Sequence, residues 1–217
     1  MNGKNQTDAI LSELLDRYPA LCDVKSDIQG AFAILADSFG RGGKLLIAGN
    51  GGSAADAQHI VGELMKGFVL PRKCDRETAE RLRMLSREQG EILANGLQIG
   101  LPAIALTAHG PLMTATMNDN DPALCFAQQV YGYGQPGDVF WGISTSGNSR
   151  NIVNAALTAR AVGMKIIGLT GPTESELSRA ADLCIRVPGT QTYEIQEYHL
   201  PVYHCICRML ESFFFAE

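Results

Sequence analysis

The sequence predicts an α/β protein built on an open, five-stranded parallel sheet with helices on both faces. Five short apolar segments, each bounded by turn residues, alternate with segments of helical length. None of the five shows strict polar alternation, as expected for parallel strands that are covered on both faces. The predicted strands are residues 44–50, 102–108, 138–145, 165–171 and 183–189.

Helices are expected between these strands and at both ends of the chain. Residues 148–162 carry an apolar stripe at helical spacing between the third and fourth strands. The N-terminal segment, residues 1–40, is expected to be helical, because apolar positions recur every three or four residues over 7–39 and predict one long or two shorter helices. Residues 191–215 predict a closing helix whose aromatic end we expect to be buried against a partner subunit.

A strongly charged insertion, residues 71–100, interrupts the alternation of strands and helices. Asp75 is suited to cap a helix, and Glu77 and Arg81 lie four residues apart on one helical face. We therefore expect one amphipathic helix over residues 75–94. It is either a solvated helix at the edge of the sheet or a lid or interface element over a ligand.

Composition limits the class of protein. The 217 residues, 46% apolar and 19% charged, are typical of one globular domain, which we expect to span residues 1–217. No run of about 18 apolar residues is present and no basic segment leads into an apolar one, so we expect neither a membrane span nor a secretory signal. The net charge of −5 argues against a nucleic-acid partner. Six scattered cysteines without a C-x-x-C pair are typical of reduced thiols in a cytoplasmic protein.

A glycine-rich turn (GNGGS), from Gly49 to Ser53, follows the first predicted strand and opens a helix. Free backbone N–H groups and the positive end of the helix dipole favour an anion there, and Ser53 adds a hydroxyl donor. The turn lacks the Lys-Ser/Thr of a P-loop. Gly49, Gly51 and Ala54 satisfy the dinucleotide-binding spacing, but the acidic residue expected about 20 positions later is missing. A sugar-phosphate or other anion site is therefore favoured over a dinucleotide site or a simple tight turn.

Four hydroxyl residues follow the third predicted strand, again before a helix: Ser144, Thr145, Ser146 and Ser149. A helix-capping role for Ser146 or Asn148 explains one of these residues and leaves the others unexplained. A neutral set of hydroxyl and peptide N–H donors suits a phosphomonoester. In a flavodoxin-like strand order the first and third strands are neighbours, so both loops are expected at the same ligand-binding edge.

Two polar clusters lie outside these loops. His59 and Glu63 are four residues apart and share one helical face, where a surface hydrogen bond competes with a ligand pair. Gln196 and His204 form a second cluster in the otherwise apolar closing segment. Because eight residues of ideal helix rise about 12 Å, these two reach one ion only if Gln196 precedes the helix, with a break at Pro201, or if two subunits contribute.

These motifs resemble those of sugar isomerase (SIS) domains and, among them, the phosphoheptose isomerases. The resemblance covers nearly the whole chain in the same order, in the segments GNGGSAADAQH (49–59), GE (62–63), ND (118–119), GISTSGNS (142–149), GLTG (168–171) and IQEYHLPVYH (195–204). It implies a flavodoxin-like single SIS domain and a homotetramer with active sites at subunit contacts. It also implies isomerisation of sedoheptulose 7-phosphate to D-glycero-D-manno-heptose 7-phosphate through an enediolate.

The resemblance further implies roles for individual residues. Glu63 and His204 correspond to the catalytic acid/base pair, although a glutamate that binds metal is a poorer base, which leaves the role of Glu63 open. Zinc would be held by His59, Glu63, Gln196 and His204. Phosphate contacts are implied for Ser53, Ser144, Thr145, Ser146 and Ser149. Further substrate contacts are expected from Asn50, Gly51, Gly52, Asp119 and Gln196. On its residues alone, Asn118-Asp119 favours a turn pair over a polar group that reaches the sugar.

Three features depart from the family pattern, and because they flank the expected pocket they bear on the choice of sugar rather than on the isomerase chemistry. The charged insertion is longer, Lys66 stands where an arginine is usual, and Tyr193-Glu194 replaces a common Asp-Arg pair. Two alternatives follow: a non-catalytic SIS protein that regulates replication initiation, and an isomerase of a pentose or hexosamine phosphate. The presence of both Glu63 and His204 favours an enzyme.

Overall fold

The computed structural model describes residues 2–216, which fold around one parallel sheet of five strands. The strand order is β2-β1-β3-β4-β5, which is the flavodoxin-like order and confirms the predicted fold class. The strands are β1 (Leu45–Ala48), β2 (Ala103–Ala105), β3 (Val139–Ile143), β4 (Lys165–Thr170) and β5 (Leu183–Arg186). Strand β2 is shorter than predicted because the chain turns into a 3-10 helix at Leu106–Ala108.

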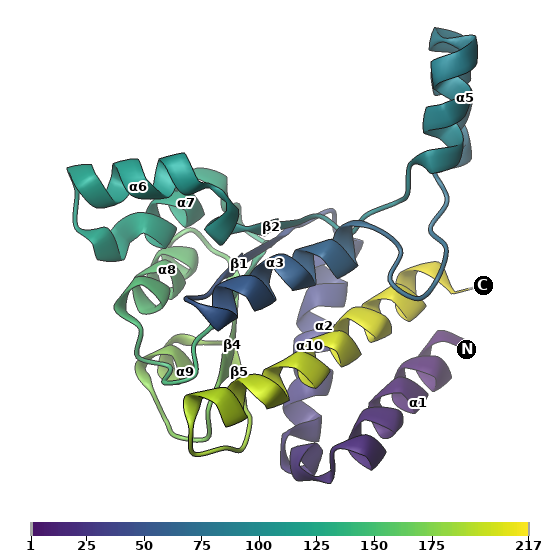
Figure 1. Ribbon diagram of the computed structural model, residues 1–217. Coiled ribbons are helices and arrows are strands. Elements are labelled where there is room, and N and C mark those ends of the chain that lie inside the picture. The colour runs from purple at the N-terminus through teal and green to yellow at the C-terminus, as the bar shows by residue number, and fades with distance from the viewer. Residues whose placement is uncertain (1, 217) are drawn as a thin grey trace.

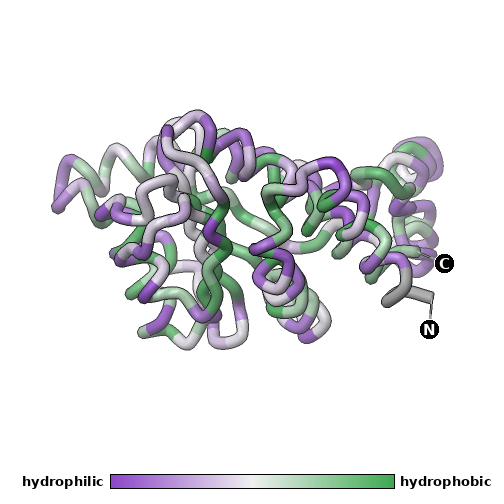
Figure 2. Tube along the Cα trace, turned by 90° about the horizontal axis from the view of Figure 1, so that it is seen from below, coloured by the Kyte–Doolittle hydropathy of each residue, from purple (hydrophilic) through white to green (hydrophobic). Residues whose placement is uncertain are grey.

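Each face of the sheet packs against its own hydrophobic core, which explains why the strands lack alternating polar residues. In β1, Leu45 and Ile47 pack into one core, whereas Leu46 and Ala48 pack into the other. All four side chains are fully buried. Figure 2 shows the hydrophobic residues concentrated along the strands in the middle of the molecule.

Helices cover both faces (Figure 1). The core on one face is closed by α2 (Lys25–Gly40), α3 (Gly52–Met65) and α10 (Thr192–Phe215), with α1 (Asn2–Arg17) packed on α10. The core on the other face is closed by α7 (Cys125–Tyr133), α8 (Arg150–Ala161) and α9 (Glu176–Ala180), and α6 (Gly110–Asp119) lies beside α7. A short 3-10 helix, Pro122–Leu124, joins α6 to α7.

The N-terminal segment forms two helices rather than one long helix. A 3-10 helix at Pro19–Val24 separates α1 from α2.

The closing helix α10 runs without interruption through Pro201 and includes Gln196. Of the two alternatives for Gln196, the one in which it precedes the helix with a break at Pro201 is therefore wrong. Burial of the adjoining residues Val202 and Tyr203 in the core holds the helix together where Pro201 lacks an N–H donor.

The charged insertion contains two helices, α4 (Arg76–Leu85) and α5 (Arg87–Gly96), where we expected one. Helix α4 ends before Ser86 because the backbone of Ser86 is extended. The Ser86 hydroxyl then caps α5 by accepting a hydrogen bond from the Gln89 N–H. Gly90 lets the two helices pack closely: a Cβ at this position would lie 2.0 Å from the carbonyl oxygen of Leu82. The expected cap at Asp75 is confirmed.

We call residues 73–98 the arm, because this helical hairpin projects away from the sheet (Figure 1). Its base is closed by a β-bridge between Lys73 and Gln98. At its tip, Met84 is 85% exposed and Leu85 is 83% exposed. A hairpin of this size buries little apolar surface, so these side chains have no partner within the part of the chain described.

No helix within residues 2–216 combines the length and apolar character needed to cross a bilayer. The six cysteines all lie within this range and are unpaired. Burial raises the pKa of the Cys205 thiol to about 12, so this side chain is a protonated packing residue.

Candidate functional site

Three helices begin at one pocket of about 360 Å³, at the carboxyl ends of β1 and β3. The pocket is lined by Asn50, Gly51, Gly52, Ser53, Ile143, Ser144, Thr145, Ser149, Thr192 and Gln196. Gly52 is the first residue of α3, Ser149 is the N-cap of α8, and Thr192 is the first residue of α10. Helix N-termini carry partial positive charge and free N–H groups, so their convergence favours an anion.

The first loop is held in a conformation that only glycine adopts readily. Gly51 has a φ of +55°, and the N–H of Ser53 donates to the carbonyl of Asn50 at 3.0 Å. The Asn50 amide exchanges two hydrogen bonds of 2.9 Å with Asn151 at the beginning of α8. This pairing ties the first loop to the second.

The second loop places two serine hydroxyls together. The Oγ atoms of Ser144 and Ser149 lie 3.0 Å apart, and Ser144 is buried. Gly147 has a φ of +65°, and a Cβ there would lie 2.0 Å from Ser175 Oγ, so glycine is required. The N-cap of α8 is Ser149, and neither Ser146 nor Asn148 occupies this position.

All the side chains that line the pocket are uncharged. Gln196 extends from α10 toward the beginning of α3, where a Cβ on Gly52 would lie 2.6 Å from Gln196 Nε2. The pocket thus offers hydroxyl, amide and peptide N–H donors together with three helix dipoles, which are the groups that bind a phosphomonoester without a fixed counter-charge.

A second group of polar side chains lies further along α3. The ligand atoms of His59, Glu63 and His204 all lie within 4.8 Å of one another. His59 Nε2 is 3.0 Å from Glu63 Oε1 and 3.4 Å from His204 Nε2. Burial, followed by the neighbouring His59, lowers the pKa of His204, so its imidazole is neutral at pH 7.

Tyr203 and Asp56 orient His59. The Tyr203 hydroxyl donates to Asp56 Oδ1 at 3.2 Å and lies 3.0 Å from His59 Nδ1. Because a phenol has one proton, His59 Nδ1 is the donor in the second contact. This tautomer leaves a lone pair on His59 Nε2, and a cation between this atom and Glu63 Oε1, 3.0 Å away, would offset the repulsion between the lone pair and the carboxylate.

These three residues fit a zinc ion. Two imidazole nitrogens and one carboxylate oxygen are a ligand set of catalytic zinc sites, which keep a further position open. The spacing within 4.8 Å allows one ion to contact all three. Gln196, the fourth expected ligand, lies instead beside Gly52, about 10 Å along α3 from His59.

Two residues expected in the site lie outside this pocket. Asp119 ends α6, is exposed and accepts a hydrogen bond from the Asn118 amide. Ser146 is exposed, and its Oγ accepts a bond from the Asn148 N–H. Their contacts with a ligand remain predictions.

Lys66, at the position that departs from the family, has its Nζ 3.8 Å from Glu63 Oε2 and a side chain that is 60% exposed.

Sequence reasoning missed Thr192, Asn151, Tyr203 and Asp56. Thr192 had a local signal, since it is the second residue of the last predicted helix (191–215). The partners of the other three are distant in sequence: Tyr203 meets Asp56 across 147 positions. No spacing rule reveals such a contact.

Known proteins resemble this chain in sequence and in fold. The SIS domain family matches residues 12–95 and 83–171 of the chain. The phosphoheptose isomerase of Akkermansia muciniphila is 36% identical over 198 residues, which cover 91% of this chain and 91% of that protein. The chain belongs to the phosphoheptose isomerase family of SIS-domain proteins. The phosphoheptose isomerase of Crocosphaera subtropica is 40% identical over 190 residues, covering 88% of this chain and 84% of that protein.

Solved structures of phosphoheptose isomerases also match this family member along almost its full length. The Neisseria gonorrhoeae enzyme superposes with a TM-score of 0.72 at 30% identity, covering 96% of this chain and 98% of that one. The Francisella tularensis enzyme gives a TM-score of 0.73 at 28% identity, covering 97% and 98%. The resemblance inferred from the motifs is therefore confirmed.

Proposed function

We propose that this protein is an aldose–ketose isomerase that converts sedoheptulose 7-phosphate to D-glycero-D-manno-heptose 7-phosphate. The observation that carries the proposal is that α3 begins at a neutral anion pocket and, about 10 Å further on, presents the cluster His59–Glu63–His204. A sugar phosphate has its phosphate at one end and its carbonyl at the other. The high coverage of relatives named phosphoheptose isomerase supports a heptose.

The pocket binds the phosphate and so fixes the position of the distant carbonyl end. Peptide N–H groups at the start of α3 and the hydroxyls of Ser53, Ser144 and Ser149 donate to the phosphate oxygens. Binding energy gained at the phosphate orients C1 and C2 against the cluster.

Glu63 and His204 carry out the proton transfers. The Glu63 carboxylate removes a proton from C1 of the ketose, and the electron pair forms the C1–C2 double bond of an enediolate. The neutral imidazole of His204 accepts the O1 proton and delivers the same proton to O2, which returns His204 to its neutral form. Return of the proton from Glu63 to C2 gives the aldose, so no proton or electron is gained or lost overall.

We further propose that His59, Glu63 and His204 hold zinc, in which case a carboxylate or imidazole atom bound to the ion no longer accepts a proton. Gln196, which lies about 10 Å along α3 from His59 in the same chain, would be a substrate contact, or a fourth ligand supplied by another subunit. A bound zinc ion supplies a Lewis acid that polarises the carbonyl and stabilises the enediolate charge. The tautomer of His59 set by Tyr203 supports this assignment, because it leaves the ligating lone pair free.

Self-association is proposed as well, as a homotetramer with active sites at subunit contacts. Exposed apolar side chains support it: Met84 and Leu85 at the tip of the arm, and Phe213 near the end of α10, which is 52% exposed. The arm carries charges of both signs, which suits contact with another copy of itself.

Glu63→Gln should lower turnover by about 10²- to 10⁴-fold, because the amide cannot accept the carbon-bound proton. Binding of sedoheptulose 7-phosphate should stay within about tenfold, since the pocket is unchanged. Steady-state kinetics and calorimetry measure the two effects, and zinc per chain is determined on the same samples. Turnover at the wild-type rate would remove Glu63 from the proton transfer, and loss of zinc together with turnover would make it a metal ligand.

Ser149→Ala should raise KM about tenfold with little change in kcat, the cost of one hydrogen bond to a charged group. Thr158→Ala is the matched control, because it removes a hydroxyl from the other end of α8, where it bonds to the Asn154 carbonyl. An equal KM for both variants would mean that the phosphate binds elsewhere.

Replacing Met84 and Leu85 together by glutamate should reduce the molar mass measured by light scattering from four chains to two or one. Two carboxylates on the tip would have to be desolvated in any apolar contact. Gln89→Glu adds charge to the arm without removing apolar surface and should leave the mass unchanged. A tetramer that persists in the double variant would exclude the arm from the subunit contact.

A further inference from the structure

A buried ion pair joins the base of the arm to α10 and takes no part in the proposed chemistry. Arg72 Nε lies 2.8 Å from Glu211 Oε1, and the two side chains are 0% and 1% exposed. Charges removed from water to this extent need several partners. The other contacts of this pair reach the end of α3 that carries Glu63 and the surroundings of His204.

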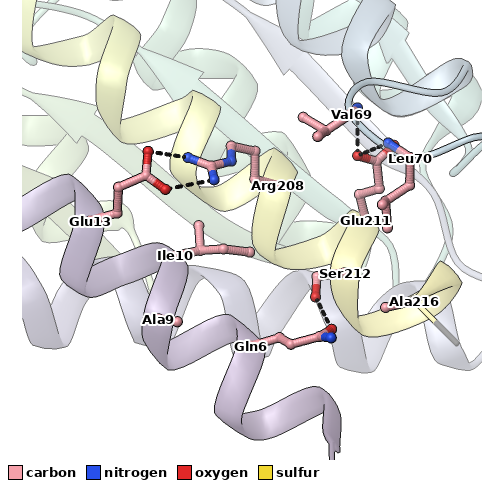
Figure 3. Close-up of a pocket in the computed structure, with 10 residues that line it drawn as sticks. All are labelled: Gln6, Ala9, Ile10, Glu13, Val69, Leu70, Arg208, Glu211, Ser212 and Ala216. Carbon is pink, nitrogen blue, oxygen red and sulfur yellow. Dashed lines mark hydrogen bonds and ion pairs between the residues drawn. The ribbon is translucent and has the colours of Figure 1, made fainter.

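Glu211 organises the segment that follows α3. Its carboxylate accepts the N–H groups of Phe68 (2.8 Å), Val69 (2.7 Å) and Leu70 (3.0 Å), in addition to Arg72. Figure 3 shows Glu211 reaching from α10 to Val69 and Leu70. Burial opposes ionisation of this carboxyl, but the three peptide donors and the charge of Arg72 outweigh it and lower its pKa. Glu211 is therefore a buried carboxylate at neutral pH.

Arg72 uses its remaining donors on the last turn of α3. Nη1 donates to the carbonyl of Leu64 at 2.7 Å, and Nη2 donates to the carbonyl of Glu63 at 3.2 Å. Carbonyls at a helix C-terminus lack helical partners and carry partial negative charge, which a guanidinium satisfies. The Phe215 ring, 4.6 Å from Cζ, covers the other side of the group. Arg72 thus fixes the backbone of the residue that supplies the proposed base.

The same pair fixes the other half of the cluster. Glu211 follows His204 on α10 by two helical turns, a rise of about 10 Å. The backbone N–H of Phe68 donates to Glu211. The side-chain ring of Phe68 lies 5.4 Å from the His204 ring, measured between centroids. Through one ion pair, the end of α3 with Glu63 is joined to the helix that carries His204.

We propose that Arg72 and Glu211 are positioning residues that set the separation between Glu63 and His204. The inference rests on the proposed function in one respect, that these two residues transfer the protons. It gives the first residues of the charged insertion a role at the active site. A planar guanidinium can reach Glu211 and both carbonyls at once, whereas a lysine ammonium at this position cannot.

Arg72→Lys is the decisive variant, because it keeps the positive charge opposite Glu211 and loses the planar guanidinium that donates to Glu211 and both carbonyls. We expect kcat to fall about 10- to 100-fold, as for second-shell groups that orient ligands, with KM within about threefold because the phosphate pocket lies at the other end of α3. Asp138→Asn is the matched control. It disrupts a similar network, in which Asp138 accepts from Lys44 and Gln135, just before the amino end of β3. Its kcat should stay within about twofold of wild type.

Histidine side-chain NMR gives a readout that does not depend on activity, since the chain has only four histidines. Arg72→Lys should shift the His59 and His204 signals and leave those of His109 and His199 in place, whereas Asp138→Asn should shift none. If Arg72→Lys does not fold, the pair is replaced by Arg72→Met with Glu211→Leu, which removes both buried charges together. A folded variant with kcat within threefold and unshifted His59 and His204 would overturn the proposal. An inactive wild type would count against the proposed function alone, because the NMR comparison still tests the positioning.

Discussion

The side-by-side, parallel pairing of β1 and β3 is the constraint on which the rest of the structure depends. In this pairing Leu46 lies opposite Phe140, and Ala48 lies opposite Gly142, so both strands end at the same edge. The loops that follow these two strands must then lead into α3 and α8 at neighbouring positions along this edge. The Asn50–Asn151 amide pair links those two turns. Three helix dipoles are brought to one pocket without any charged side chain, which suits reversible binding of a phosphorylated sugar.

Helix α3 runs from the pocket at this edge to the cluster of His59, Glu63 and His204, so the candidate site has two ends. Its first residues line the pocket, and its later turns carry His59 and Glu63 toward α10. Helix α10 begins at the same pocket and packs along α3, so Gln196 meets Gly52 and His204 meets His59. In the proposed reaction, the distance from the phosphate to the reacting carbons would be set by the rise of α3, and the position of Glu63 relative to His204 by the contacts at the far ends of α3 and α10.

The sequence was informative wherever the relevant signal is local. The alternation of apolar segments predicted the sheet, and the loops after the first and third strands predicted the residues that line the pocket, including Ser53, Ser144 and Ser149. It failed where a partner is distant or where two local tendencies compete. The periodicity of the arm continues across Ser86, but the cap at this residue divides the segment into two helices. Pro201 suggested a break that burial in the core prevents. The pair of Arg72 and Glu211, separated by 139 positions, leaves no pattern in the sequence.

If the two ends of α3 serve one reaction, the protein should exchange a carbon-bound proton of sedoheptulose 7-phosphate with solvent. The purified protein, with and without zinc, is incubated with sedoheptulose 7-phosphate in heavy water and followed by NMR. We expect aldose phosphate to appear and to carry deuterium at C2, because the proton on Glu63 exchanges with solvent between its removal from C1 and its return to C2. Absence of both deuterium and aldose, while line broadening shows that the sugar phosphate is bound, would contradict this expectation.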